Sequence, residues 1–272
     1  MIKEYDQITA LHYAAYRPSL HKNILKTYLP TTPKSNYGLD IGCGTGQSAI
    51  ALSKFCNTVV GVDPSKEMIK KSIKHTGVSY ESMETKTLNF DSDRFDIITF
   101  AGSLFYAKSQ ELLDECIRVS KANSLIIAYD FEILLTDILK LLGVDTETDV
   151  TSGYDHEINF SGLHTTNVHL NSQYKQSIRL DITVADLAHV LLSSKNDYIT
   201  MANTFGTENL FEKLQQELEN KLNTTHTTIK ANTFLNAYTV KKNMGCKDYF
   251  LRFINSASIS FSVKPFACKS IR

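Results

Sequence analysis

The chain has 272 residues, of which 42% are hydrophobic and 21% are charged. This composition excludes a disordered chain and suits one large domain with its own core. The 29 Lys and Arg residues balance the 29 Asp and Glu residues, so the formal net charge is zero. A neutral balance gives no electrostatic footprint for nucleic acid or for an anionic membrane, and we expect neither as a partner.

The sequence also indicates a compartment. Residues 1–6 carry charges of both signs and no apolar run, which is not the pattern of a secretory signal. The most apolar stretch, residues 124–144, is interrupted by acidic and basic side chains and does not predict a membrane span. The five cysteines are scattered and form no C-x-x-C pair, which is typical of reduced thiols. We therefore expect a cytoplasmic protein.

The first half of the chain alternates short apolar runs with segments of helical spacing. This alternation predicts an α/β fold in which helices cover both faces of a parallel sheet. The expected strands lie at residues 37–41, 58–62, around 80, 95–100 and 124–129, and the expected helices at 47–55, 64–75 and 110–119.

The pattern changes after Asp130. Residues 131–180 mix helix-like apolar spacing with a polar stretch rich in Thr, Ser, Asn and His. Amphipathic helices are expected over 183–192 and 210–222, and one or two closing strands over 227–240. The segments 249–254 and 259–263 fit a hairpin, a helix or an assembly segment.

A glycine-rich turn follows the first predicted strand, where Gly42, Gly44 and Gly46 alternate just before a helix. Glycine is needed where the backbone takes positive φ or where a ligand approaches closely. The second predicted strand ends at Asp63, whose carboxylate can accept both hydroxyls of a ribose. Open α/β sheets bind ligands at this edge, so the sequence predicts a site for a nucleoside-containing cofactor.

The spacing of the glycines narrows the cofactor class. A pyrophosphate-binding turn has the form G-x-G-x-x-G, whereas in this sequence the third glycine comes one position early. The sequence G-K-[ST] is absent after the glycines, which excludes a P-loop. Asp40, two residues before Gly42, suits a ligand that carries an ammonium and a sulfonium. The alternative interpretation is an ordinary tight turn between a strand and a helix.

Residues 39–46 followed by 59–65 resemble the first motifs of class I S-adenosylmethionine-dependent methyltransferases, an acid followed by G-x-G-x-G. The resemblance covers about residues 10–130, and 180–242 more loosely. The segment HYAAYRP at residues 12–18 is similar to that of small-molecule members related to trans-aconitate methyltransferase.

The resemblance implies a Rossmann-like, seven-stranded, mostly parallel sheet with helices on both faces and a helical cap inserted after strand five. The methyltransferase domain would span residues 1–242, with 131–200 as an acceptor-recognition cap and 243–272 as a C-terminal extension of unknown role.

The resemblance also implies a binding site for S-adenosyl-L-methionine. The glycines would meet its methionine portion, Asp40 would hold its amino group directly or through water, and Asp63 would grip the ribose. Met68 and Met83 have a plain alternative as core packing. The full implied set is Asp40, Gly42, Cys43, Gly44, Gly46, Asp63, Pro64, Met68, Ser82, Met83, Glu84, Ala101, Gly102 and Ser103.

Candidates near the reacting methyl group are Tyr13, Arg17, Phe105 and Tyr106. Related small-molecule enzymes often carry a His-Trp pair where this chain has Phe105-Tyr106, so no histidine base is predicted there. An aromatic wall remains, which can stabilise a sulfonium by cation–π attraction. Arg17 could pair with a carboxylate or be a surface charge, and Tyr13 with Tyr16 could form a lid or pack within the first helix.

Three histidines, His156, His164 and His169, lie with Asp155 and Glu157 in the polar stretch. Their spacing matches no metal site, so we expect a solvated loop and no metal. The function predicted from all these features is methyl transfer from S-adenosylmethionine to a small carboxylate, hydroxyl or amine, by in-line displacement. The alternatives are a protein or nucleic-acid acceptor, and a non-catalytic S-adenosylmethionine-binding regulatory module. The sequence leaves the oligomeric state open.

Overall fold

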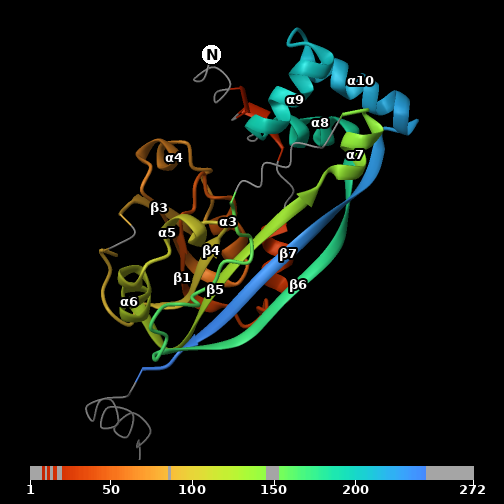
Figure 1. Ribbon diagram of the computed structural model, residues 1–272. Helices are drawn as coiled ribbons and strands as arrows, with labels where there is room; N and C mark the ends of the chain where they lie inside the picture. The colour runs from red at the N-terminus through yellow and green to blue at the C-terminus, as the bar shows by residue number, and fades with distance from the viewer. Residues whose placement is uncertain are drawn as a thin grey trace, which may run out of the picture.

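The computed structural model describes residues 8–9, 11–12, 15–16, 20–84, 87–144 and 153–242. They contain a seven-stranded sheet in the order β3-β2-β1-β4-β5-β7-β6 (Figure 1). The first five strands pair in parallel, and β7 runs antiparallel to both β5 and β6. The strands are β1 (Ser35–Ile41), β2 (Cys56–Asp63), β3 (Val78–Ser82), β4 (Phe95–Ala101), β5 (Ser120–Leu134), β6 (Val168–Thr183) and β7 (His226–Val240). The predicted Rossmann-like, mostly parallel sheet is confirmed.

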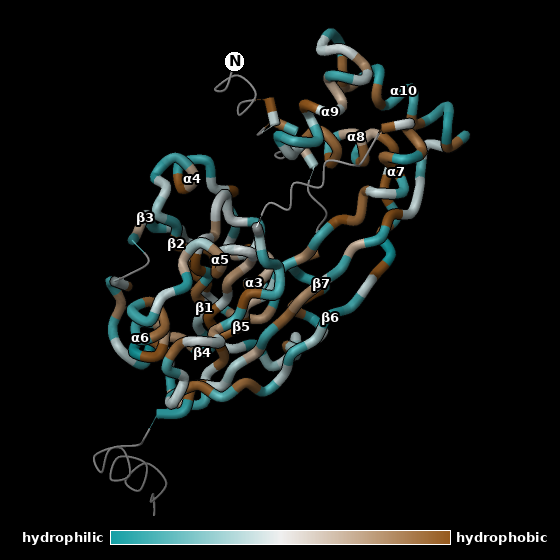
Figure 2. The backbone as a smooth tube through the Cα atoms, viewed as in Figure 1, coloured by the Kyte–Doolittle hydropathy of each residue, from teal (hydrophilic) through white to brown (hydrophobic). Residues whose placement is uncertain are grey.

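Helices pack on both faces of the parallel part of the sheet. On one face, α5 and α6 place Leu104 and Leu112 against Ile98 and Phe100. On the other, α3 packs against β1 and β2, and α2 packs against α3 and β7. Figure 2 shows hydrophobic segments in these central strands. The helices are α2 (Leu20–Lys26), α3 (Gln47–Leu52), α4 (Lys66–Lys70), α5 (Leu104–Ala107) and α6 (Gln110–Val119).

The last three strands are longer than the rest and carry a helical group beyond the sheet (Figure 1). This group has its own apolar core, which includes Leu187, Met201 and Leu214. It consists of α7 (Thr136–Leu141), α8 (Val184–Leu192), α9 (Lys195–Phe205) and α10 (Leu210–Leu222).

The helical cap expected at residues 131–200, directly after strand five, is not confirmed. Residues 131–134 complete β5, and residues 168–183 form the edge strand β6. Most of the helical group instead lies between β6 and β7. The strand β6 was not predicted, because Ser172 and Gln176 interrupt the alternation of its apolar residues with polar ones.

One predicted helix is shorter than expected. The helix expected over residues 64–75 ends at Lys70, because the chain then turns back to the glycine turn. There the backbone N–H of Ile73 donates to the carbonyl of Thr45 at 3.0 Å. None of the helices in the described residues is long and apolar enough to cross a membrane.

Candidate active site

The glycine turn joins β1 to α3 at the carboxyl edge of the sheet. Gly42, Gly44 and Gly46 all have positive φ, at 72°, 54° and 97°. A Cβ at Gly42 would overlap Ser103, and one at Gly46 would overlap the Tyr80 ring. A Cβ at Gly44 would meet nothing within 4 Å, so the turn presents bare backbone to open space there. This is the room that a ligand needs when it lies close to the main chain.

Asp63 ends β2 beside this turn and ties it to the neighbouring strand. One carboxylate oxygen accepts a hydrogen bond from the Gly44 N–H at 3.0 Å, and the other accepts from the Ser65 N–H at 2.8 Å. The carboxylate is therefore held in place at the carboxyl end of β2, where it lines a cavity.

Asp40 lies behind the turn and has no exposed surface. Its carboxylate accepts hydrogen bonds from the hydroxyls of Ser48 at 2.5 Å and Thr99 at 2.7 Å. Burial, together with the nearby Asp63 charge, raises its pKa to about 6 despite these two donors. Asp40 thus contributes negative potential from behind the turn, and its side chain does not line the cavity.

A cavity of about 590 Å³ opens at the carboxyl ends of β1, β2 and β4. This volume lies in the range of small-molecule sites. Seven of the residues expected around the cofactor or the methyl group line it, together with five that the sequence did not predict. The lining residues are Gly42, Asp63, Pro64, Ala101, Gly102, Ser103, Tyr106, Ala107, Asp130, Phe131, Tyr154 and His156.

A histidine and a carboxylate are paired in the wall of this cavity. Nδ1 of His156 lies 2.8 Å from a carboxylate oxygen of Asp130, and the same oxygen accepts from the Tyr154 hydroxyl at 2.9 Å. The other Asp130 oxygen accepts from the Phe131 N–H at 2.8 Å. The hydrogen bond to Asp130 raises the pKa of His156, although partial burial of the ring opposes this effect.

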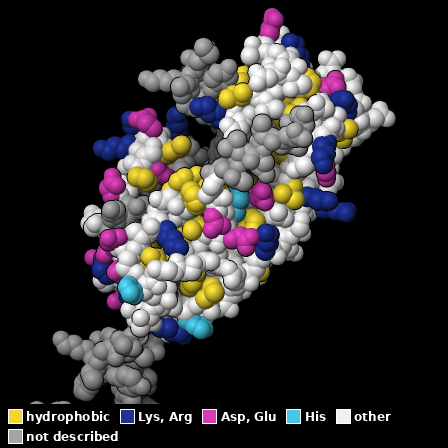
Figure 3. Space-filling view, in the orientation of Figure 1, with side chains coloured by type: hydrophobic (Ala, Val, Ile, Leu, Met, Phe, Trp, Pro, Cys, Tyr) yellow, Lys and Arg dark blue, Asp and Glu magenta, His cyan; other side chains and the backbone are white. Residues whose placement is uncertain are grey.

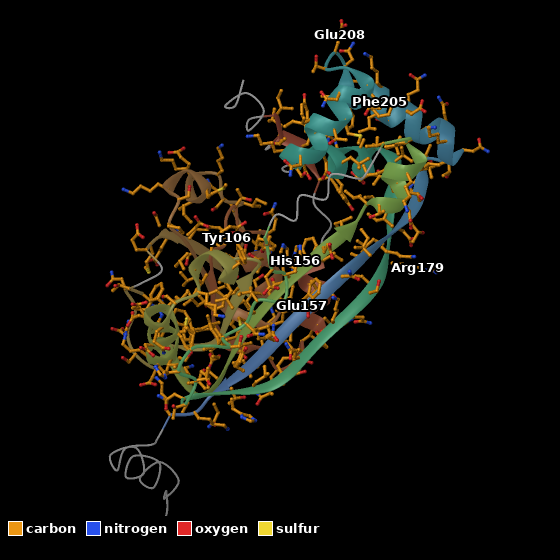
Figure 4. All side chains as sticks on the ribbon, in the orientation of Figure 1. Tyr106, His156, Glu157, Arg179, Phe205 and Glu208 are labelled. Atoms are coloured by element: carbon orange, nitrogen blue, oxygen red, sulfur yellow. The ribbon has the colours of Figure 1, made fainter. Side chains whose placement is uncertain are left out.

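Aromatic rings surround the pair. Tyr154 contacts Phe105, with ring centroids 4.6 Å apart, and Tyr106 at 5.7 Å. The His156 ring stacks on Phe234 at 5.7 Å with an angle of 13° between the planes. Tyr106 is 79% exposed and lines the cavity. Figure 4 shows Tyr106 and His156 near the end of the sheet, well apart from Phe205 and Glu208 in the helical group.

Other predicted site residues lie outside the cavity lining. Cys43 is buried against Gly61, and this burial raises the pKa of its thiol. Met83 packs against the hydrophobic core, and its backbone N–H donates a hydrogen bond to the Asp63 carbonyl. Met68, Ser82 and Glu84 are exposed near the ends of β2 and β3. Tyr13 and Arg17, like the C-terminal segment 243–272, lie outside the described residues.

The histidines considered as metal ligands do not gather. Within the described part of the chain, no group of three or more His, Cys, Asp or Glu side chains is placed to hold a metal ion. His156 pairs with Asp130, while His164 and His169 are exposed.

Sequence reasoning missed the Asp130–His156 pair and Tyr154. Asp130 directly follows the run that was expected as strand five, just as Asp63 directly follows the run expected as strand two. A carboxylate at the end of a strand was thus the signal that could have identified Asp130 as a site residue. Nothing in the spacing showed that residues 154–156 return to this strand.

Comparison with known proteins agrees with this geometry. Residues 39–128 match the model of a family described as a methyltransferase domain. A proposed methyltransferase of Dictyostelium discoideum is 26% identical over 101 residues, covering 37% of this chain and 38% of that protein. A ubiquinone biosynthesis O-methyltransferase of Coxiella burnetii is 32% identical over 96 residues, covering 33% and 41%. The chain thus spans about two fifths of the length of these relatives.

A solved structure extends the fold comparison to most of the chain. A proposed type II methyltransferase of Anaeromyxobacter dehalogenans has a TM-score of 0.56 and 16% identity, covering 83% of this chain and 96% of that one. Residues 39–128 are thus similar to a methyltransferase domain, and the solved structure shows that the fold of the chain is the Rossmann-like fold of that protein. The finer resemblance to trans-aconitate methyltransferase is not confirmed.

Proposed function

We propose that this chain is an S-adenosylmethionine-dependent methyltransferase whose acceptor is a small molecule. The observation that carries the proposal is the cavity that reaches both the glycine turn at Gly42 and the carboxylate of Asp63. The buried carboxylate of Asp40 behind the turn favours a cationic ligand over a pyrophosphate. The buried thiols of Cys43, Cys56 and Cys116, which form no disulfide, support a cytoplasmic location.

The residues around the cavity suit the cofactor. The open space at Gly44 leaves the backbone accessible, Asp63 would accept the ribose hydroxyls, and Pro64 and Ser103 would border the bound molecule. Bound S-adenosylmethionine supplies a methyl group that its positively charged sulfur has already activated. The part left to the protein is to align an acceptor with that methyl group and to exclude water.

A small acceptor is favoured by the volume of the cavity, about 590 Å³, and by its wall, to which Phe131, Tyr154 and His156 contribute. A hydroxyl acceptor has support from the similarity to a ubiquinone biosynthesis O-methyltransferase. The alternatives are a protein or nucleic-acid acceptor and a non-catalytic binding module.

Methyl transfer should be measured by the release of S-adenosylhomocysteine from S-adenosylmethionine with a panel of small hydroxyl, amine and carboxylate compounds. We expect turnover with at least one small acceptor in the panel and a loss of at least about 100-fold in kcat/KM for Asp63→Ala, since ribose positioning is lost. Turnover only with protein or RNA fractions would contradict the small acceptor. Binding of S-adenosylmethionine without any turnover would favour the regulatory module.

A further inference from the structure

We infer that His156 is the general base of the methyl transfer and that the acceptor is a hydroxyl group on an aromatic ring. This inference rests on the proposed function, because it assigns the chemistry of the same cavity. It is carried by the Asp130–His156 pair, the charges that line the cavity and the aromatic rings beside it.

The hydrogen bonding of His156 suits a base. Nδ1 faces the Asp130 carboxylate at 2.8 Å, so this nitrogen carries the proton when the imidazole is neutral. Nε2 has no hydrogen-bond partner among the residues that the structure describes, and the ring lines the cavity. The free lone pair of Nε2 is therefore the one available to an incoming acceptor. Stacking on Phe234 fixes the plane of the ring.

Asp130 acts through His156 and is a positioning residue. Its carboxylate is only 10% exposed and is held by the Phe131 N–H and the Tyr154 hydroxyl. The Tyr154 hydroxyl also lies 2.7 Å from the carbonyl of Gly102, at the end of β4. The Asp130–His156 pair is thus held by contacts to two strands of the sheet. These contacts keep the imidazole in a fixed position, which a general base needs in order to accept a proton from the bound acceptor.

The charges of the cavity disfavour a carboxylate acceptor. Two carboxylates, Asp63 and Asp130, lie among the described lining residues, and none of those residues is Lys or Arg. Figure 3 shows acidic and hydrophobic side chains around a histidine in the middle of this face, with basic side chains beside them. A carboxylate acceptor would meet repulsion there and would need no base, which would leave His156 without a role.

A protonated amine is also disfavoured, because it has no lone pair with which to attack and must first lose a proton. The two carboxylates that line the cavity, Asp63 and Asp130, stabilise its charged form and oppose that loss. An uncharged hydroxyl has no such need, and its proton passes directly to a neutral imidazole.

The rings beside the pair indicate an aromatic acceptor. Tyr106 is 79% exposed and borders the cavity, while Phe105 and Tyr154 support it from behind with ring centroids 5.3 and 5.7 Å away. An exposed, supported ring offers a flat apolar face for another ring to stack on. In the reaction the acceptor oxygen bonds to the methyl carbon, and the S–C bond breaks with its electron pair going to sulfur. The hydroxyl proton goes to Nε2 of His156.

The pH dependence follows from the groups that face His156. Asp130 and Glu132 from β5 and Asp155 beside it all favour the charged imidazolium. Glu157 is paired with Lys175 at 2.8 Å, so its charge is largely compensated. Since the neutral imidazole is the active form, the rate should rise with pH through a pKa above the ordinary value of His. Removing the Asp130 charge lowers that pKa, so Asp130→Asn should move the rising limb to lower pH while reducing kcat.

The test combines a binding, a spectroscopic and a kinetic measurement on the whole chain. NMR titration should find the His156 pKa above its ordinary value in the wild type and lower in Asp130→Asn. With S-adenosylmethionine, the probes are phenols of graded acidity, with benzoate and benzylamine as matched acceptors. His156→Gln should slow methylation of the weakest phenol by about 100-fold or more and that of the most acidic phenol least, because an ionised phenol needs no base. The exposed His164→Gln is the control and should leave the rates unchanged.

Calorimetry with S-adenosylhomocysteine separates the two proposals. Failure of the wild type to bind it would remove the proposed function itself. Unchanged binding by His156→Gln, with the graded loss on phenols, supports the inference. The inference is overturned if the cofactor product binds but no phenol is methylated, if benzoate or benzylamine is preferred, or if His156→Gln slows all phenols equally.

Discussion

Replacing Gly46 with alanine is expected to lower the free energy of unfolding by roughly 3 kcal/mol and to weaken the binding of S-adenosylhomocysteine. Two costs add at this position. The φ of 97° is strained for any residue with a Cβ, and the new Cβ would overlap the Tyr80 ring. That ring is held by the hydrogen bond from its hydroxyl to the Ile73 carbonyl at 2.9 Å, so it cannot yield freely.

The matched control is Gly143→Ala, at a φ of 73° where a Cβ would meet nothing within 4 Å. It carries only the backbone cost, about 1 kcal/mol. Urea unfolding of both variants measures the two values. Equal losses would show that Tyr80 does not restrain the turn, and unaltered ligand binding by Gly46→Ala would show that the shape of the turn is unimportant for the site.

Replacing Asp40 with asparagine is expected to make the protein relatively more stable as the pH rises from 4 to 7. Burial raises the pKa of Asp40 from 3.8 in the unfolded chain to about 6 in the folded one. The folded state therefore binds more protons between these values, and the stability contributed by the protonated group is lost as the pH passes through about 6. The difference between the two pKa values of Asp40 corresponds to a loss of roughly 3 kcal/mol in the free energy of unfolding at neutral pH.

Asparagine has the shape of the protonated acid and no charge to bury, and its amide can still bond the hydroxyls of Ser48 and Thr99. The unfolding free energy of Asp40→Asn minus that of the wild type should thus increase between pH 4 and pH 7. Asp137→Asn, at an exposed position in the first turn of α7, should show a nearly flat difference. A difference that falls with rising pH would mean that the two hydroxyls stabilise the Asp40 carboxylate more than burial destabilises it.

The parallel half of the fold could be predicted because its signals are local. Buried strands such as β1 and β4 read as short apolar runs, and the helices α6 and α10 begin and end where their amphipathic spacing does. The glycine turn and Asp63 could be predicted because a positive φ and a carboxylate at a strand end are properties of single positions.

The rest depends on long-range pairing. The edge strand β6 was not predicted because the polar residues Ser172 and Gln176 break its apolar alternation, so its extent depends on its pairing with β7. The Asp130–His156 pair joins residues 26 apart in sequence, with the end of β5 and helix α7 between them, and no local pattern encodes their contact. The same histidine was assigned to a solvated loop because its neighbours in sequence, Asp155 and Glu157, are indeed polar.

The central claim is that the glycine turn and Asp63 form a cofactor site, and titration calorimetry with S-adenosylhomocysteine tests it most directly. The account predicts one binding site per chain in the wild type. The affinity of Asp63→Ala should be lower by about 10-fold to 100-fold, because hydrogen bonds to a charged group are lost. The affinity of the exposed control Asp137→Ala should be unchanged. Absence of binding by the folded wild type, or equal affinity in Asp63→Ala, would contradict it.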